Sequence, residues 1–257
     1  MRRLLRRSLR LGFPAMLHYL VNHYAPSSSL ISIRPRAALH PLKLRAFDSD
    51  LDVLSQIFIE QHYADVRLAR PDGLVIDCGA NVGLSSAYFL SRFPAATVIA
   101  IEPDPGNFEL LQTNLAPYGT RARPVKGAIW SHDCHLQITT RAYDDGRSWA
   151  RQVEPSPSED TGTVRGIGIG SLLDGSGFDR ISLLKMDIEG AEAIVFGDGH
   201  EKWLPRTDCL AVELHDDTHF GNATAAFDEM VRPLNPALSR SGEIVVASFR
   251  CDEEIRC

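Results

Sequence analysis

Cysteines are few in this sequence, and none are spaced as a structural metal site requires. Five cysteines occur among 257 residues, and no two of them are separated by only two residues. Structural zinc sites use closely spaced pairs of Cys or His ligands, so we expect no such site. An odd number of cysteines without a pairing pattern is typical of a reducing compartment, and we therefore predict a cytoplasmic protein.

Long apolar runs and an excess of basic residues are also missing. No run approaches the roughly 18 apolar residues of a membrane-spanning helix. The 33 acidic residues outnumber the 27 Lys and Arg residues, and the net charge is −6. A surface that follows the phosphates of a nucleic acid needs clustered basic residues, so we expect no nucleic-acid partner.

The one dense basic cluster lies at the N-terminus. Arginine occupies positions 2, 3, 6, 7 and 10, just before the apolar run 11–21. A basic amphipathic helix can bind anionic lipid, so residues 1–20 are a candidate for peripheral membrane contact. The alternative is a helix that packs Leu5, Leu9 and Phe13 against its own domain.

The pattern along the chain divides it into two parts. Residues 1–70 predict an accessory segment with an extended piece near residues 31–33 and a helix that begins at Ser49 or Asp50. From residue 71 to 257, apolar strands alternate with helices, which is typical of a mainly parallel sheet. We therefore predict an α/β domain over residues 71–257, preceded by an N-terminal accessory helical segment.

The individual elements follow from apolar periodicity, prolines and glycines. We predict helices at 84–93, 105–115, 191–196 and 223–231, and strands at 74–76, 97–101, 124–130, 136–140, 181–186, 209–214 and 243–249. The polar stretch 154–166 predicts a loop. Only one strand is marked after the last helix.

The first chemical motif is a strand that ends in an acid and runs into a glycine turn. Residues 75–83 read VIDCGANVG, with Asp77 at the strand end and Gly79, Asn81 and Gly83 in the turn. Ligands of open α/β sheets bind beyond these strand ends. A dinucleotide site would use GxGxxG to receive a pyrophosphate, which Asp77 would repel. The cationic cofactor S-adenosylmethionine fits better; the alternative is that Asp77 only caps the next helix.

A second strand ends in a carboxylate at a suitable distance from the first. Glu102 lies 25 residues after Asp77, about the separation at which α/β nucleotide sites place a ribose-binding acid. Pro103 follows it directly, and Ala128 lies in the next predicted strand. We assign Glu102, Pro103 and Ala128 to the cofactor site.

The third motif places several acids at the end of another buried strand. In the run LLKMDIEGAE, Asp187 and Glu189 follow the strand and Glu192 falls in the next helix. Like charges destabilise one another, so we expect this cluster to serve a ligand. We predict that Asp187 contacts the cofactor and that Asp187 and Glu189 are candidate proton acceptors. The alternative is that Asp187 and Glu192 only stabilise the helix terminus.

A fourth strand ends in VELHD and places His215 at the same edge of the sheet. Histidine titrates near neutral pH and is a common general base, which makes His215 a third catalytic candidate. A purely structural histidine is the alternative.

Three of these segments, VIDCGANVG, VIAIEPDPGNFELLQTNL and LLKMDIEGAE, resemble the FkbM family of S-adenosylmethionine-dependent methyltransferases. The third is the most diagnostic, and the resemblance covers roughly residues 42–250. It implies a Rossmann-like class I methyltransferase fold: a mostly parallel seven-stranded sheet with helices on both faces and the last strand antiparallel.

The resemblance also implies roles for single residues. Asp77, Gly79 and Asn81 match the motif around the methionine part of the cofactor, and Glu102 matches the ribose-binding acid. Asp187 and Glu189 match a signature near the methyl acceptor.

The implied activity is O-methylation of a small molecule, sugar or related metabolite. A hydroxyl must lose its proton as it is methylated, and Asp187, Glu189 or His215 could accept that proton. Oxygen ligands suit Mg²⁺, but the reaction does not require a metal and we predict none. The alternatives are a non-catalytic or membrane-associated relative that binds the cofactor, and an NAD-dependent oxidoreductase, against which the missing GxGxxG argues.

Overall fold

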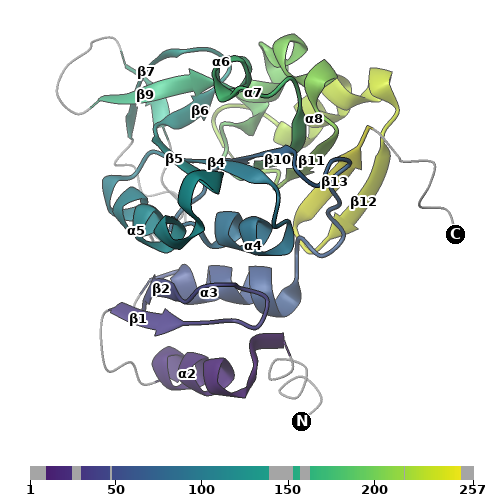
Figure 1. Ribbon diagram of the computed structural model, residues 1–257. Coiled ribbons are helices and arrows are strands. Elements are labelled where there is room, and N and C mark those ends of the chain that lie inside the picture. The colour runs from purple at the N-terminus through teal and green to yellow at the C-terminus, as the bar shows by residue number, and fades with distance from the viewer. Residues whose placement is uncertain are drawn as a thin grey trace, which may run out of the picture.

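The structure is a computed structural model that describes residues 10–24, 30–46, 48–138, 153–156, 163–216 and 218–249. Its central element is a seven-stranded sheet of order β12-β13-β11-β10-β3-β4-β5 (Figure 1). The strands of this sheet are β3 Leu74–Cys78, β4 Thr97–Glu102, β5 Ala122–Lys126, β10 Ile181–Met186, β11 Cys209–Val212, β12 Ala237–Ser241 and β13 Ile244–Ser248.

The strand directions confirm the fold that the sequence predicts. β5, β4, β3, β10 and β11 run parallel to one another, whereas β13 is antiparallel to both β11 and β12. Every residue of β3 and β10 is buried, as expected of parallel strands covered on both faces. The strand that the sequence does not mark is β12, the first strand of the C-terminal hairpin; its residues are almost all exposed and therefore show no apolar alternation.

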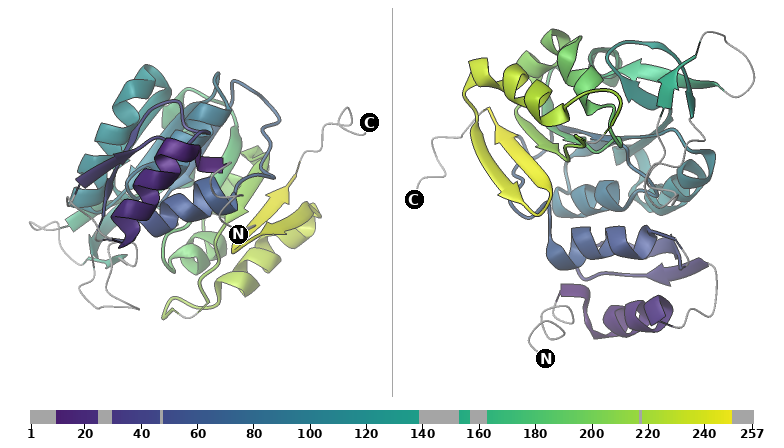
Figure 2. Two further views of the ribbon diagram at one scale, coloured as in Figure 1. Left: turned by 90° about the horizontal axis from the view of Figure 1, so that it is seen from below. Right: turned by 180° about the vertical axis from the view of Figure 1, so that it is seen from behind.

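Helices cover both faces of the sheet (Figures 1 and 2). One face carries α4 Leu84–Arg92 and α5 Pro105–Leu115; the other carries α6 Ile169–Ser176, α7 Glu192–Gly197 and α8 Ala223–Val231. Adjacent residues of one strand therefore enter different cores: Val75 packs with the α4 side and Ile76 with the α6–α8 side. The connecting short helices are η2 Ala116–Arg121, η3 His200–Lys202, η4 Leu204–Arg206 and η5 Arg232–Leu234.

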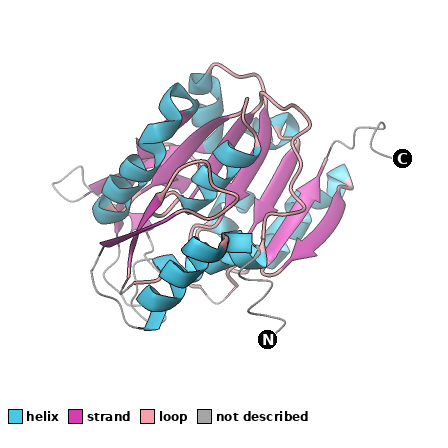
Figure 3. Ribbon diagram, turned by 60° about the horizontal axis from the view of Figure 1, so that its bottom comes forward, coloured by secondary structure: helices cyan, strands magenta, loops and turns pink. Residues whose placement is uncertain are grey.

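The accessory segment forms further layers over α4 and α5 (Figures 1 and 3). It consists of α2 Phe13–Tyr24, the antiparallel hairpin of β1 Leu30–Ile33 and β2 Leu42–Arg45, and α3 Asp50–Leu54, which continues into the π-helix η1 Ser55–Glu60. The extended piece at 31–33 and the helix from Asp50 are thus confirmed. Buried side chains of this segment share one core with α4 and α5.

The predicted membrane contact concerns a part of the chain that is only partly described. Leu5 and Leu9 lie outside the described residues, whereas Met16 and Tyr19 of α2 are buried against the domain. None of the helices in the described residues is both long enough and apolar enough to cross a membrane. Membrane contact of residues 1–20 stays a prediction.

The region after β5 differs from the sequence prediction. The single strand expected over 124–130 is two strands, because the chain leaves the main sheet at Gly127 and continues as β6 Ala128–Trp130 in a second sheet. This four-stranded sheet has the order β6-β9-β7-β8, with β7 Cys134–Ile138, β8 Val153–Pro155 and β9 Thr163–Gly168. The loop predicted over 154–166 is therefore wrong at both ends, which belong to β8 and β9 and pair with β7. These two strands lack the regular apolar pattern by which a strand is recognised in a sequence.

Candidate active site

The carboxyl ends of four parallel strands open onto one cavity of about 360 Å³, here called the main cavity. The turn after β3 contributes Gly79 and Asn81, and Glu102 comes from the end of β4. Asp187 follows β10, and Glu213 follows β11. The four segments meet because neighbouring parallel strands end at the same edge of a sheet.

The turn after β3 is held tightly against β10. Gly79 has φ +73°, and a Cβ on it would lie 1.8 Å from the carbonyl oxygen of Asp187. The amides of Gly79 and Ala80 donate to the Ile101 carbonyl at 3.1 and 2.9 Å. Asn81, also left-handed at φ 49°, lines the main cavity, and its buried Oδ1 accepts no hydrogen bond from the described residues. That oxygen is an acceptor available to a ligand.

Glu102 is a fixed carboxylate in the cavity wall and is only 5% exposed. Its Oε2 accepts from the Asn81 amide at 2.9 Å, and its Oε1 accepts from the Asp104 amide at 3.0 Å and from Asn107 Nδ2 at 3.3 Å. Burial raises the pKa of Glu102 to about 7, against the effect of these hydrogen bonds. Hydroxyl groups of a bound ligand would supply the donors that water no longer provides.

Asp77 lies beneath the cavity rather than in its wall. It is fully buried and is not among the residues that line the main cavity. Its Oδ2 accepts from the hydroxyls of Ser85 and Ser86, both at 2.6 Å, and its Oδ1 lies 3.2 Å from Lys185 Nζ. This position differs from the direct cofactor contact that the sequence predicts, because the carboxylate is already paired with a buried ammonium group.

Lys185 is a cation of the site that the sequence analysis missed. Its Nζ donates to the carbonyls of Cys78 at 3.2 Å and Gly79 at 2.7 Å, and lies 3.7 Å from Asp187 Oδ2. Burial alone would lower the pKa of Lys185, but the carboxylates of Asp77 and Asp187 outweigh it and raise the pKa. The signal was one charged residue, a lysine, within a mostly apolar strand, since a buried charge requires a buried partner.

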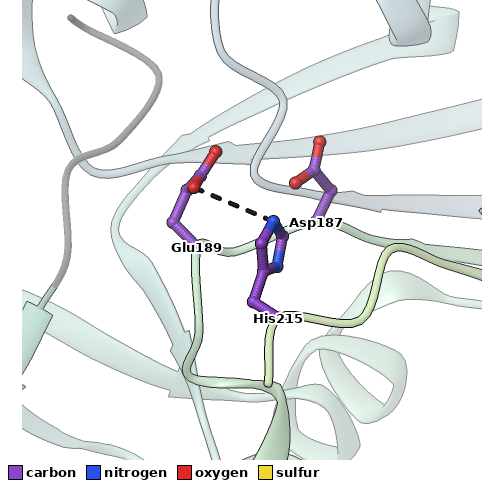
Figure 4. A group of neighbouring side chains, drawn as sticks. All are labelled: Asp187, Glu189 and His215. Atoms are coloured by element: carbon purple, nitrogen blue, oxygen red, sulfur yellow. Dashed lines mark ion pairs between the residues drawn. The ribbon is translucent and has the colours of Figure 1, made fainter. Parts of the chain in front are cut away.

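Asp187, Glu189 and His215 point toward one another from the loops after β10 and β11 (Figure 4). His215 Nε2 lies 3.8 Å from Glu189 Oε2 and 3.9 Å from Glu213 Oε1. On its other side, His215 Nδ1 lies 3.0 Å from Oε1 of Glu192, which is fully buried. Glu192 Oε1 thereby accepts the hydrogen bond from Nδ1–H, which orients Nε2 toward Glu189 and Glu213, both of which line the cavity.

This cluster carries more negative charge than its described neighbours neutralise. Burial and neighbouring carboxylates, Asp187 foremost, raise the pKa of Glu189 and of Glu213 to about 8. Burial would lower the pKa of His215, but Glu192 and the other acids raise it to about 10. A cation that enters the cavity would relieve this repulsion.

The same cluster has the donor set of a divalent metal site. One ligand atom from each of Asp187, Glu189 and His215 lies within 4.8 Å of the other two. Two carboxylates and an imidazole can bind a divalent cation. Against this, the Lys185 ammonium lies 3.7 Å from Asp187, and a protonated His215 offers no lone pair. The absence of a resident metal stays a prediction.

Most of the predicted site residues meet in the main cavity. Its lining includes the predicted residues Gly79, Asn81, Glu102, Pro103, Ala128, Asp187, Glu189 and His215. Gly83 precedes the first residue of α4 and, like Asp77, does not line it. The lining also includes residues that the sequence analysis did not assign to the site, namely Gln56, His62, Tyr63, Lys185, Glu213 and Glu243. Most of these come from segments far from the motifs, where no local pattern marks them.

Comparison with known proteins finds a methyltransferase family and relatives that are named methyltransferases. The family model described as the methyltransferase FkbM domain matches residues 77–239. Methyltransferase 1 of Beauveria bassiana is 28% identical over 182 residues, which cover 63% of this chain and 72% of that protein. The 2-O-methyltransferase NoeI of Sinorhizobium fredii is 27% identical over 209 residues, which cover 76% and 82%.

A solved structure shares the fold. The crystal structure of methyltransferase FkbM from Methylobacillus flagellatus KT superposes with a TM-score of 0.50 at 18% identity. The match covers 74% of this chain but 47% of the other, so the chain spans about half the length of that protein. The likeness supports the Rossmann-like class I methyltransferase fold, in agreement with the seven-stranded, mostly parallel sheet of this chain.

Proposed function

The chain belongs to the FkbM family of methyltransferases, and from this premise we propose that it is an S-adenosylmethionine-dependent enzyme whose main cavity holds the cofactor. We propose further that the methyl group goes to a hydroxyl oxygen of a small molecule or sugar. One observation carries the proposal. One side of the main cavity, at the ends of β3 and β4, presents Asn81 and Glu102, which suit a nucleoside. The other side, after β10 and β11, presents His215, which Glu192 orients as a proton acceptor.

The residues of the first wall fit the cofactor. Glu102 presents a desolvated carboxylate suited to ribose hydroxyls, and Asn81 presents a buried Oδ1 that lacks a donor. Asp187 and the acids near it favour the positive charge of the amino group and the sulfonium. Asp77 contributes indirectly, because it holds Lys185, whose Nζ binds the Gly79 carbonyl of the turn.

The second wall fits the chemistry. S-adenosylmethionine, when bound, supplies a methyl group on a sulfonium centre. The protein must then hold the acceptor hydroxyl in line with that group and remove its proton. We assign His215 Nε2 as the proton acceptor, with Glu192 fixing the ring and Glu189 next to the imidazolium that forms. The positive charge of the cofactor would lower the raised pKa of His215 and so free its lone pair for this role.

One relative supports a hydroxyl acceptor. NoeI is named a 2-O-methyltransferase, and the alignment with it covers 76% of this chain. The proton acceptor His215 fits the same chemistry, because a hydroxyl must lose its proton to a base and the sulfonium of the cofactor cannot act as that base.

Isothermal titration with S-adenosylhomocysteine tests the cofactor site. We expect the wild type to bind and Glu102→Ala to lose at least tenfold in affinity, because hydrogen bonds to a charged group contribute about 1.5–3 kcal/mol. Glu109→Ala is the matched control, since Glu109 is an exposed glutamate on α5. Equal affinities of the wild type and Glu102→Ala would refute the assignment.

A further inference from the structure

A second cavity of about 490 Å³ adjoins the main cavity. Gln56, His62 and Glu243 line both, so they form the boundary between the two. The rest of the second cavity, here called the vestibule, is lined by Tyr19, Asp52, Ser55, Glu60 and Gly242. The vestibule therefore lies next to the main cavity, on the side of the accessory segment.

The vestibule is built from parts of the chain that the family model does not match. Its walls come from α2, α3, η1 and the turn between β12 and β13, whereas the match runs from residue 77 to residue 239. The cofactor wall, with Gly79, Glu102 and Asp187, lies inside the match. The vestibule is thus lined by residues outside the part of the chain that the family model matches.

The walls of the vestibule pack against one another. Gly242 has φ +61°, and a Cβ on it would lie 2.6 Å from His62 Nε2, so the β12–β13 turn packs directly on this imidazole. His62 Nε2 lies 3.4 Å from Glu60 Oε2, and the Ser55 hydroxyl donates to Glu60 Oε1 at 3.0 Å. These contacts hold a carboxylate at the rim in a defined position.

The charge of the vestibule is predominantly negative. Asp52, Glu60 and Glu243 line it, and His62 is the only basic side chain among its described lining residues. Glu243 lines both cavities, and its carboxylate is one of the charges that raise the pKa of Glu213 in the main cavity. An anionic acceptor would be repelled by this negative charge, and a protonated amine would be attracted.

We propose that the vestibule is the acceptor site and that the acceptor is a hydroxylated amine such as an amino sugar. The carboxylates of Glu60 and Glu243 bind its ammonium group while a hydroxyl reaches His215. That hydroxyl oxygen bonds to the methyl carbon as the carbon–sulfur bond breaks, the bonding pair stays on sulfur, and the hydroxyl proton passes to His215 Nε2. This proposal rests on the proposed function and adds the class of substrate.

Saturation-transfer NMR on the enzyme loaded with S-adenosylhomocysteine tests the proposal with three probes: glucosamine, glucose and glucuronic acid. We expect glucosamine to bind at least tenfold more tightly than glucose, and glucuronic acid to bind most weakly. Glu243→Gln and Glu60→Gln should each reduce the preference for glucosamine over glucose by threefold or more. Glu229→Gln, an exposed glutamate on α8, should leave the preference unchanged.

Titration of the same variants with S-adenosylhomocysteine separates the two proposals. Retained cofactor binding without a preference for glucosamine, or with a preference insensitive to both vestibule variants, overturns the amine acceptor and leaves the cofactor site standing. Failure of the wild type to bind S-adenosylhomocysteine overturns the proposed function and this inference together.

Discussion

Single residues of the site act through buried charges that face one another. Asp77 and Lys185 are both almost fully buried and lie 3.2 Å apart, so each supplies the counter-charge that the other needs. Around His215 the opposite charges are not equal in number, because the three carboxylates of Glu189, Glu192 and Glu213 surround one imidazole. The first pair is a structural support, and the second group is available to respond to a ligand.

Glu192 is expected to set the pKa of His215 in catalysis. Glu192→Gln removes a buried negative charge 3.0 Å from His215 Nδ1, so the pKa of His215 falls and its neutral form exists at lower pH. We expect the acid limb of the kcat profile to move down by about one pH unit or more, with kcat reduced about tenfold and the KM for the acceptor little changed. Glu201→Gln, on an exposed residue of η3, is the control. An unmoved acid limb would contradict the assignment.

Glu213 is expected to make the ligand-free protein less stable as pH rises. Its folded pKa of about 8 lies above the ordinary 4.5, so its contribution to stability is full below pH 4.5 and is lost as pH rises through 8. Glu213→Gln stays neutral throughout. We therefore expect the variant to gain about 1 kcal/mol or more in unfolding free energy over the wild type at pH 8.5 but almost nothing near pH 4.5. Urea unfolding at both pH values measures this, and an equal difference at the two would count against it.

At the scale of elements, the site depends on how closely the β3–α4 turn approaches the end of β10. The Gly79 amide donates to β4 while the Gly79 carbonyl receives Lys185, which extends from β10. The turn therefore ties three neighbouring strands together at the edge where the cavity opens. A side chain at position 79 would push the turn away from Asp187.

Gly79→Ala is expected to damage both folding and cofactor binding. The left-handed backbone costs an alanine about 1–3 kcal/mol, and its Cβ would collide with the Asp187 carbonyl. We expect more than about 2 kcal/mol of destabilisation and at least a tenfold loss of S-adenosylhomocysteine affinity. Gly175→Ala is the control: it lies within α6 with open space around it, and alanine there should stabilise by up to about 1 kcal/mol. Equal stability of the two variants would contradict this role of the turn.

For the whole molecule, the accessory segment and the α/β domain meet in one core. The sequence predicts a boundary at residues 70 and 71, but Leu42 and Leu44 of β2 are fully buried in the same cluster as the residues of α4 and α5. The hairpin and α3 therefore stabilise the layer of helices that supports the cofactor turn. They also place the π-helix η1 in the wall of the main cavity.

Leu44→Ala tests whether the two parts unfold together. Leu44 is fully buried, and removing such a side chain costs about 2–5 kcal/mol. With one shared core, we expect a single unfolding transition at lower temperature by calorimetry, with loss of cofactor binding in the same step. Leu39→Ala, at a site 47% exposed, should have little effect. Two separate transitions, of which only one moves, would show independent units.

The site motifs could be predicted from the sequence because each one is local. An apolar strand followed by Glu102 or Asp187 can be recognised from fewer than ten consecutive residues. Parallel strands then bring the carboxyl ends that carry these acids to the same edge of the sheet. The sequence shows a lysine at position 185, but it does not show that this lysine pairs with Asp77, because the two positions are 108 residues apart. The strand β12 could not be predicted from the sequence, because an exposed edge strand needs no pattern of apolar residues.

The sequence by itself determined the class of fold, the family and the kinds of side chain at the strand ends, since these follow from short-range periodicity and from contiguous motifs. Only the tertiary structure decided that Asp77 is buried and paired with Lys185, that Glu192 orients His215, and that the accessory segment and the β12–β13 turn together line the vestibule. The reason is physical: burial, pairing and cavity shape depend on distances between residues far apart in the chain, and no local pattern encodes those distances.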